Sequence, residues 1–294
     1  MAIRLFVIGN GFDLAHKLPT SISCDFKNVA MSLDGGDFWS LYSFDENKLW
    51  SEFESALSKP EIESLFTILD AYPPDYSSDH ESDRDSIIGY VNLIGKLRES
   101  VEAFAHNAEQ KLYSVKPINR FSLCFKPDDL FINFNYTSTL QKVYGISESQ
   151  VLHIHGHVGS SPLLLGYKDG TLDLGKIFVD VHNGRGHMLK TETYIAEIED
   201  YYVQTAYENL IKKIKGFSKP SVSDKLSVFL ESKVVSEIKV IGHSLGDCDT
   251  DYFSSLDRKY PKTNWTITYH DNKEEMMRRI NSLFPLRNCN LIKM

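Results

Sequence analysis

The sequence predicts an α/β fold with a mainly parallel sheet and helices on both faces. Residues 3–8 form a short apolar run rich in β-branched and aromatic side chains, which is typical of a strand buried on both faces. Strand and helix patterns then alternate toward both ends of the chain, as in βαβ units. Between them, residues 48–113 have mostly helical spacing, which predicts an α-helical insertion within a single domain of residues 1–294.

Further strands and helices are expected from the same periodicities. The strand patterns are at 130–134, 151–154, 163–165, 238–241 and 265–269. The helical patterns are at 61–69, 87–112, 195–214, 224–233, from about 251, and at 273–283.

Composition and charge restrict the classes of function. The 294 residues include 32 Lys and Arg against 40 Asp and Glu, and the resulting net charge of -8 argues against nucleic acid or an anionic membrane surface as the main partner. The N-terminal apolar run is far shorter than the roughly 18 residues of a membrane span, so a cytoplasmic protein is expected. The four cysteines form no Cys-x-x-Cys pair, which indicates buried free thiols rather than a zinc ribbon.

The first strand is followed by Gly9-Asn10-Gly11, which is typical of a nucleotide-binding turn. Glycines let the chain turn sharply and let a ligand approach backbone N–H groups, and a following helix favours phosphate. The third glycine of the dinucleotide fingerprint is absent, since Leu14 stands in its place. An ordinary tight turn is the alternative interpretation.

Three other predicted strands also end in polar residues. These segments are Asn133 to Thr137, His153 to His157, and Gly242 to Asp247. Ligands collect at the carboxyl ends of parallel strands, so the four segments are expected to line one cleft along one edge of the sheet.

The segments and the residues that follow them contain the motifs Gly-Asn-Gly-Phe-Asp-Leu-Ala with Leu-Pro-Thr, Phe-Asn-Tyr-Thr, His-Ile-His-Gly, and Gly-His-Ser-Leu-Gly with Asp-x-x-Tyr-Phe. Taken together, these motifs resemble the AbiH family of bacterial abortive-infection (anti-phage) proteins. The resemblance covers about residues 3–284. The AbiH family in turn looks like a distant branch of the sirtuin-like NAD-binding folds.

The resemblance implies a sirtuin-like, Rossmann-type domain that binds and cleaves NAD. By motif match the catalytic residues are Asn135 and His155, with Thr137 in place of the usual Asp of an Asn-Tyr-Asp motif. The absence of paired cysteines argues against protein deacylation. The expected nucleotide-binding residues are Gly9, Asn10, Gly11, Phe12, Asp13, Asn133, Tyr136, Thr137, Gly242, His243 and Ser244.

The residue types suit this chemistry. Cleavage of the nicotinamide-ribose bond develops oxocarbenium character, so an amide that fixes the ribose and a base with a pKa near 7 are needed. Asn135 and His155 supply these types, and Asp13 is a candidate to orient the ribose or stabilise the cation. In the alternative interpretation, Asn133 and Asn135 cap the next helix and His155 is a core histidine.

Gly242-His243-Ser244-Leu245-Gly246 also matches the nucleophile elbow of serine hydrolases. Asp271 adjoins His270, which leaves too little room for a normal triad, and the acidic stretch 247–251 replaces the small residues that usually follow the elbow. A serine hydrolase acting through Ser244 is therefore the weaker alternative.

His153, His155 and His157 alternate as zinc ligands on a strand do, but Gly156 is expected to break the strand, so no metal is expected. The loop Gly184 to His187 is either a lid whose Arg185 reaches a phosphate or an exposed loop without a role.

The leading hypothesis is therefore an anti-phage effector that hydrolyses the N-glycosidic bond of NAD or a related nucleotide. A non-catalytic module that senses a nucleotide is the second hypothesis. The trigger, phage-derived or from the host, and the oligomeric state, a homo-oligomer included, stay open.

Overall fold

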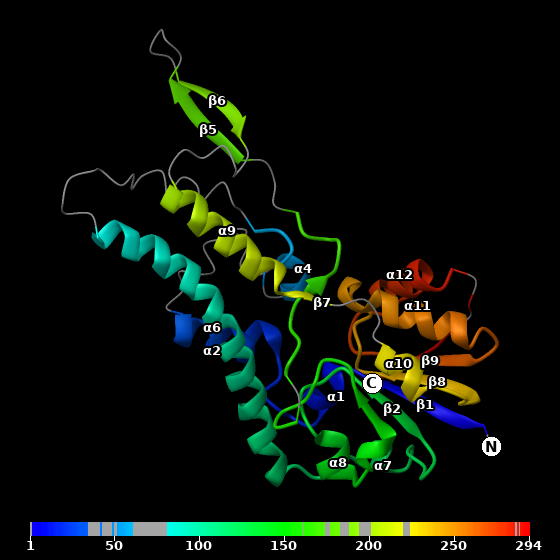
Figure 1. Cartoon of the computed structure of the whole chain (residues 1–294). Coiled ribbons are helices and arrows are strands. Elements are labelled where there is room, and N and C mark those ends of the chain that lie inside the picture. Colours follow the sequence, from blue (N-terminus) through cyan, green and yellow to red (C-terminus); the bar gives the residue numbers. More distant parts are fainter. Residues whose placement is uncertain are drawn as a thin grey trace. The chain divides into compact units, whose positions relative to one another are not determined.

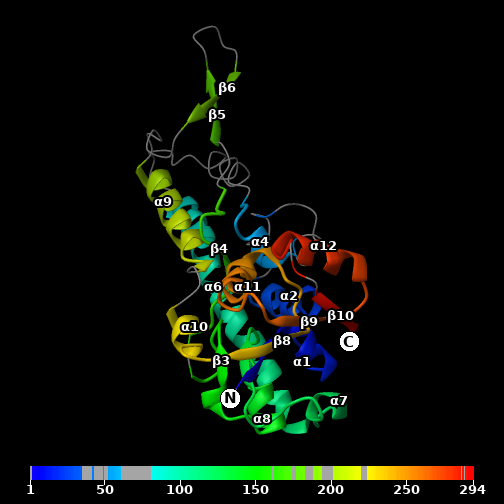
Figure 2. The same cartoon turned by 90° about the vertical axis from the view of Figure 1, so that its right-hand side faces the viewer.

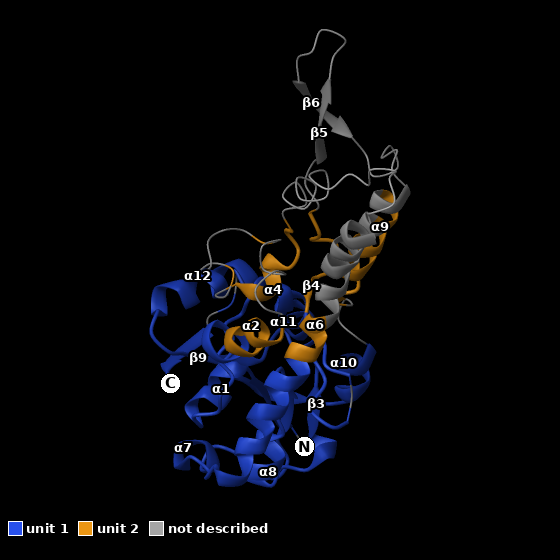
Figure 3. Ribbon diagram, turned by 90° about the vertical axis from the view of Figure 1, so that its left-hand side faces the viewer, with its two compact units in different colours: residues 1–26, 101–165, 220–294 blue, residues 27–100, 166–219 orange. Residues whose placement is uncertain are grey.

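The computed structural model describes residues 2–34, 42, 49, 52–60, 81–160, 162–173, 177–182, 188–193, 201–219, 224–285, 287 and 289–294. The chain divides into two compact units (Figure 3). Unit 1 comprises residues 1–26, 101–165 and 220–294, and unit 2 comprises residues 27–100 and 166–219. None of the described helices combines the length and apolar content that crossing a membrane requires.

Unit 1 contains a sheet of six strands, and every pair of neighbours is parallel. The order across the sheet is β10-β9-β8-β1-β2-β3, with β10 at one edge and β3 at the other (Figure 2). The strands are β1 (Ile3–Ile8), β2 (Leu130–Asn133), β3 (Val151–His153), β8 (Val235–Ile241), β9 (Asn264–Tyr269) and β10 (Cys289–Lys293). Numbered along the sheet, this is the order 3-2-1-4-5-6 of the Rossmann fold. The predicted α/β class with a mainly parallel sheet is confirmed.

Both faces of the sheet are covered, which explains the continuous apolar runs of its central strands. In β1, Leu5 and Val7 belong to one apolar cluster, and Phe6 and Ile8 to another on the opposite face. All four side chains are completely buried. The first strand of the sequence is thus the centre of the sheet.

Helices from different parts of the chain cover the two faces (Figure 1). The cluster around Leu5 and Val7 includes side chains of α10 (Asp224–Phe229), α11 (Thr250–Lys259) and α12 (Lys273–Leu283). The cluster around Phe6 and Ile8 includes side chains of α1 (Asn10–Ala15), α7 (Asn119–Ser122) and α8 (Thr139–Tyr144). Short helical turns also occur at η1 (Ile22–Phe26), η3 (Leu112–Ser114), η4 (Glu148–Gln150) and η6 (Asp247–Asp249).

The sheet has its topological switch point between β1 and β8. β2 follows β1 and lies on one side of this pair, whereas β9 follows β8 and lies on the other, so the segments after β1 and β8 diverge at their carboxyl ends. Ligands of open parallel sheets bind at such a point. The Gly9 and Gly242 turns both lie there.

Unit 2 consists of helices and two small sheets. It contains α2 (Lys27–Asp34), α4 (Phe53–Ala56), the first part of α6 (Glu81–Lys111) and α9 (Tyr201–Lys215). Strands β4 (Tyr167–Lys168) and β7 (Ser218–Lys219) are parallel, and β5 (Ile177–His182) and β6 (Met188–Thr193) form an antiparallel pair. Unit 2 thus contains part of the predicted 48–113 insertion together with residues 166–219.

Some predicted elements differ from the structure. The predicted strand 163–165 is wrong, because residues 162–166 form no strand, and three consecutive leucines carry no alternation that would distinguish strand from loop. Strands β5, β6 and β10 were not anticipated. The predicted helix 61–69 and the Gly184 to His187 loop lie outside the described residues.

Candidate functional site

The segments that follow β1, β2, β3 and β8 meet at the carboxyl edge of the sheet. The Nδ2 amide of Asn135, after β2, donates to the carbonyl of Gly9, after β1, at 3.2 Å. His155, after β3, lies 3.3 Å from Asp249, which follows β8. The structure therefore brings the two predicted catalytic residues to the ends of β1 and β8.

The Gly9 and Gly242 turns contact each other through their backbones. A Cβ atom added to Gly9 would lie 2.5 Å from the Cα of His243, and one added to Gly242 would lie 2.3 Å from the nitrogen of Phe12. Both positions therefore require glycine, and Gly242 also has a φ of +67°. The N–H groups of Gly9 and Gly11 donate to the carbonyls of Ile241 and Gly242.

The N–H group of Phe12 donates to the carbonyl of Gly9, so three N–H groups of the first turn are engaged within the protein. Asn10 is partly exposed, and its amide donates to the carbonyl of Thr20 at 2.7 Å. Close packing of two turns thus accounts for the glycines of the motif.

Asp13 is the centre of a buried polar network. Its carboxylate accepts hydrogen bonds from the hydroxyls of Thr137 and Thr139 at 2.6 and 2.8 Å, and only 1% of the residue is exposed. Burial raises the pKa of Asp13 to about 6, and the bonds from Thr137, Thr139 and Asn135 oppose that rise. The threonine that replaces the Asp of the Asn-Tyr-Asp motif is therefore a hydrogen-bond donor to the Asp13 carboxylate.

Asn133 holds the turn that presents Asn135. Its Oδ1 accepts the backbone N–H of Asn135 at 3.0 Å, and its Nδ2 lies 3.4 Å from the carbonyl of Thr137. Such side-chain bonds to the local backbone are typical of turns. Tyr136 in the same turn is partly exposed and donates its hydroxyl to the carbonyl of Leu164 at 2.9 Å.

His155, His243 and Asp249 form a second buried cluster. The two carboxylate oxygens of Asp249 lie 3.3 Å from Nε2 of His155 and 3.4 Å from Nε2 of His243. The ring of Phe134 meets both imidazoles edge to face, with centroids 5.3 and 4.5 Å away. The segments after β3 and β8 thus meet across the carboxyl end of β2, which lies between these strands in the sheet.

Hydrogen bonding sets the tautomer of His243. Its Nδ1 accepts the backbone N–H of Leu245 at 2.9 Å, so the proton of the neutral ring is on Nε2 and faces Asp249. One carboxylate thus lies beside two histidines, although Nε2 of His155 forms no hydrogen bond with any residue that the structure describes.

Ser244 is exposed, but it lacks the surroundings of a nucleophile elbow. The positive φ angles in its loop belong to Gly242 and Leu245, whereas a nucleophile elbow places the strain on the serine. His243 bonds Leu245 through its Nδ1, and His270 pairs with the adjacent Asp271. Among the described residues no histidine is hydrogen-bonded to the Ser244 hydroxyl.

Sequence reasoning missed Asp249, Thr139 and Phe134 as members of this site. Asp249 belongs to the acidic stretch 247–251, which in the sequence indicates only a departure from the hydrolase elbow. A carboxylate just past the end of β8, at the same sheet edge as three histidines, was the available indication.

Comparison with known proteins identifies the family. The family description "Bacteriophage abortive infection AbiH" matches residues 5–269. No curated protein and no solved structure matches this chain. Since the match spans β1 to β9 and includes every segment of the site, this chain belongs to the AbiH family of bacteriophage abortive-infection proteins.

Proposed function

We propose that this chain is an abortive-infection effector that binds NAD or a related nucleotide and hydrolyses its nicotinamide-ribose bond. The observation that carries the proposal is the contact of His155 with Asp249 beside the β1–β8 switch point of a Rossmann-ordered sheet. Rossmann sheets bind dinucleotides at this point, and a histidine oriented by a carboxylate is a common general base.

The residues divide into two roles. The Asp13 network, with Thr137 and Thr139, fixes the turn that carries Asn135. Asn135 supplies an amide near the glycine turn to fix the ribose and the attacking water. In this proposal His155 acts as the base, with its Nε2 3.3 Å from Asp249 but not hydrogen-bonded to it.

The reaction needs no co-substrate besides water. The water oxygen forms a bond to the anomeric carbon of the ribose while the bond from this carbon to the nicotinamide nitrogen breaks. Neutral nicotinamide leaves with the electron pair, and His155 accepts the proton that the water loses. Asp249 stabilises the imidazolium that forms.

Burial favours the second candidate, a module that senses a nucleotide without cleaving it. His155 is only 5% exposed, and the amide of Asn135 already donates to Gly9. A nucleotide would have to open these contacts to reach the two side chains. A rearrangement of this kind is what a sensor requires.

The test measures nicotinamide release from NAD by the full chain, both purified and in bacterial cells challenged with phage. His155→Gln and Asp249→Asn should each lower release at least about 100-fold, because each removes part of the base. His270→Gln, which alters an exposed histidine that also pairs with an aspartate, is the matched control and should retain wild-type release.

Release that is equal in wild type and His155→Gln would refute the assignment of the base. NAD-dependent thermal stabilisation without release in either setting would select the sensor. If NAD caused neither nicotinamide release nor thermal stabilisation, NAD would be excluded as the ligand. Labelling of Ser244 by a fluorophosphonate would select the hydrolase instead.

A further inference from the structure

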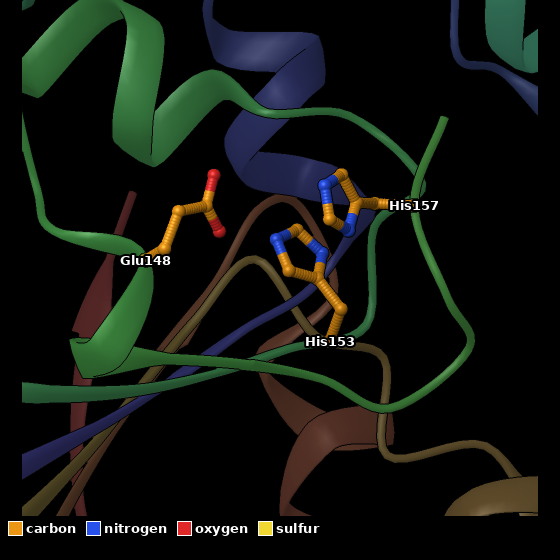
Figure 4. Close-up of side chains that lie close together, drawn as sticks. All are labelled: Glu148, His153 and His157. Carbon is orange, nitrogen blue, oxygen red and sulfur yellow. The ribbon is translucent and has the colours of Figure 1, made fainter. Parts of the chain in front are cut away.

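Beside the site just described, three metal-ligating side chains converge on the β3 edge of the sheet (Figure 4). Glu148 of η4, His153 of β3 and His157 of the following loop each offer a ligand atom, and these atoms lie within 4.8 Å of one another. The geometry points to a binding site for a divalent transition-metal ion such as Zn²⁺, with Gln141 of α8 as the fourth ligand.

The amide of Gln141 lies where two of these ligands converge. Its Nε2 donates to Nε2 of His153 at 2.9 Å and to a carboxylate oxygen of Glu148 at 3.1 Å. Two lone pairs from different elements therefore point at one position, which now holds the amide nitrogen. A cation there would receive the same two lone pairs.

The other end of the same amide supplies an independent observation. Oε1 of Gln141 is buried and accepts no hydrogen bond from the described residues. An orphaned buried carbonyl oxygen costs stability. If the Gln141 side chain moves aside from that position and its amide turns by half a turn, Oε1 faces an ion held by His153 and Glu148 and can serve as its ligand.

The surroundings of His153 leave its Nε2 facing the proposed ion. Nε2 lies 2.9 Å from the Gln141 amide nitrogen, and Nδ1 lies 3.4 Å from the carbonyl of Asn135 and 3.5 Å from the amide nitrogen of Asn133. Metal-binding histidines characteristically donate their other N–H to such a carbonyl. The same contact connects the proposed ion to the turn that carries Asn135.

His157 completes the set. Its ring stacks on that of His153 with centroids 4.2 Å apart, and the Ser160 hydroxyl contacts its Nδ1 at 2.8 Å, which fixes the orientation of the ring. Ligand atoms around tetrahedral zinc lie roughly 3.4 Å apart, so small side-chain rotations suffice to close the site. Two imidazoles and two oxygens favour Zn²⁺ or Co²⁺ over Mg²⁺ and Ca²⁺.

The experiment titrates the metal-free full chain with Zn²⁺ by calorimetry and with Co²⁺ by visible absorption. One equivalent should bind with a Kd below about 10 µM, and Co²⁺ should give a tetrahedral spectrum without a thiolate band. Glu148→Gln and His157→Gln should each weaken binding at least about tenfold, and the double variant should abolish it. His270→Gln should bind as wild type does.

Glu148 is exposed and His157 is partly exposed, so these variants should keep the fold, which circular dichroism checks. Absence of binding up to about 1 mM, or unchanged binding by the folded double variant, would overturn the site. A thiolate band would place the ion on a cysteine such as the exposed Cys24 and would overturn it too. These readouts do not depend on NAD.

Discussion

The β1–β8 junction and the β3 edge carry similar residue types but differ in how deeply they bury them. At the junction, Gly9 and Gly242 pack backbone against backbone, and the side chains of Asp13, Asn135 and His243 are buried. At the β3 edge, His153 and His157 are partly exposed and Glu148 is exposed. The difference teaches that position along one sheet edge decides what a polar side chain can do.

At the junction, polar groups are committed to one another, so a ligand must displace existing contacts. At the β3 edge, lone pairs converge where solvent and ions have access. A histidine near the junction is therefore suited to a proton transfer shielded from bulk solvent, and a histidine at the edge to holding an ion. Three predictions test this contrast.

The largest effect is expected from a substitution that disrupts the backbone contact between the Gly9 and Gly242 turns. Gly242→Ala places a Cβ 2.3 Å from the backbone nitrogen of Phe12, so the two turns must separate. We expect a loss of about 4 kcal/mol or more in the free energy of unfolding, since backbone cannot move aside as a flexible side chain can. Chemical denaturation of the purified variant, or its failure to accumulate in soluble form, measures this.

Gly145 is the matched control, because its φ of +68° equals that of Gly242 within a degree while no atom lies within 4 Å of an added Cβ. Gly145→Ala should cost only about 1–2 kcal/mol, the penalty of the left-handed conformation alone. Equal losses in the two variants would show that the turns at the junction are not in close contact.

An intermediate effect is expected from the pH dependence that Asp13 confers. Its pKa is about 6 in the folded chain against 3.8 as the reference for the unfolded chain, so the folded state binds the extra proton between these values. Stability from this group is present below about pH 4 and is lost as the pH rises through about 6, by up to about 3 kcal/mol. Asp13→Asn should abolish this loss.

Denaturant titrations of wild type and Asp13→Asn from pH 4 to pH 7 isolate this contribution as the difference between the two curves. Thr137→Val removes a donor that lowers the pKa of Asp13, so the loss should continue to a higher pH in this variant. Parallel curves for wild type and Asp13→Asn would show that the Asp13 carboxylate is not desolvated.

The sheet and the segments at its carboxyl edge could be predicted from the sequence. The buried run at β1, the Gly-Asn-Gly turn, and polar residues at four strand ends were sufficient to predict the sheet and which segments meet at its edge. Such patterns are local, and a parallel sheet brings the carboxyl ends of its strands together whatever lies between them in the sequence.

The partners within the site could not be predicted, because they depend on contacts between distant residues. Nothing in the spacing of His153, His155 and His157 indicates that His155 faces Asp249 while His153 stacks on His157. The chain leaves the strand after His153, so period-two alternation no longer applies. The role of Gln141 likewise depends on α8 packing beside η4 and β3.

The smallest effect is expected at Glu109, which forms both a partly exposed ion pair and a buried hydrogen bond. Glu109 accepts the buried N–H of Ser138 at 2.8 Å and pairs with Lys142 at 2.7 Å, and the Lys142 side chain is 40% exposed. Lys142→Met should change the free energy of unfolding by less than about 1 kcal/mol, because water screens this pair. Glu109→Ala should cost about 1–3 kcal/mol, because it orphans the buried N–H at the start of α8. Denaturation of both variants gives the comparison, and equal losses would mean that the ion pair, rather than burial, holds this part of the edge in place.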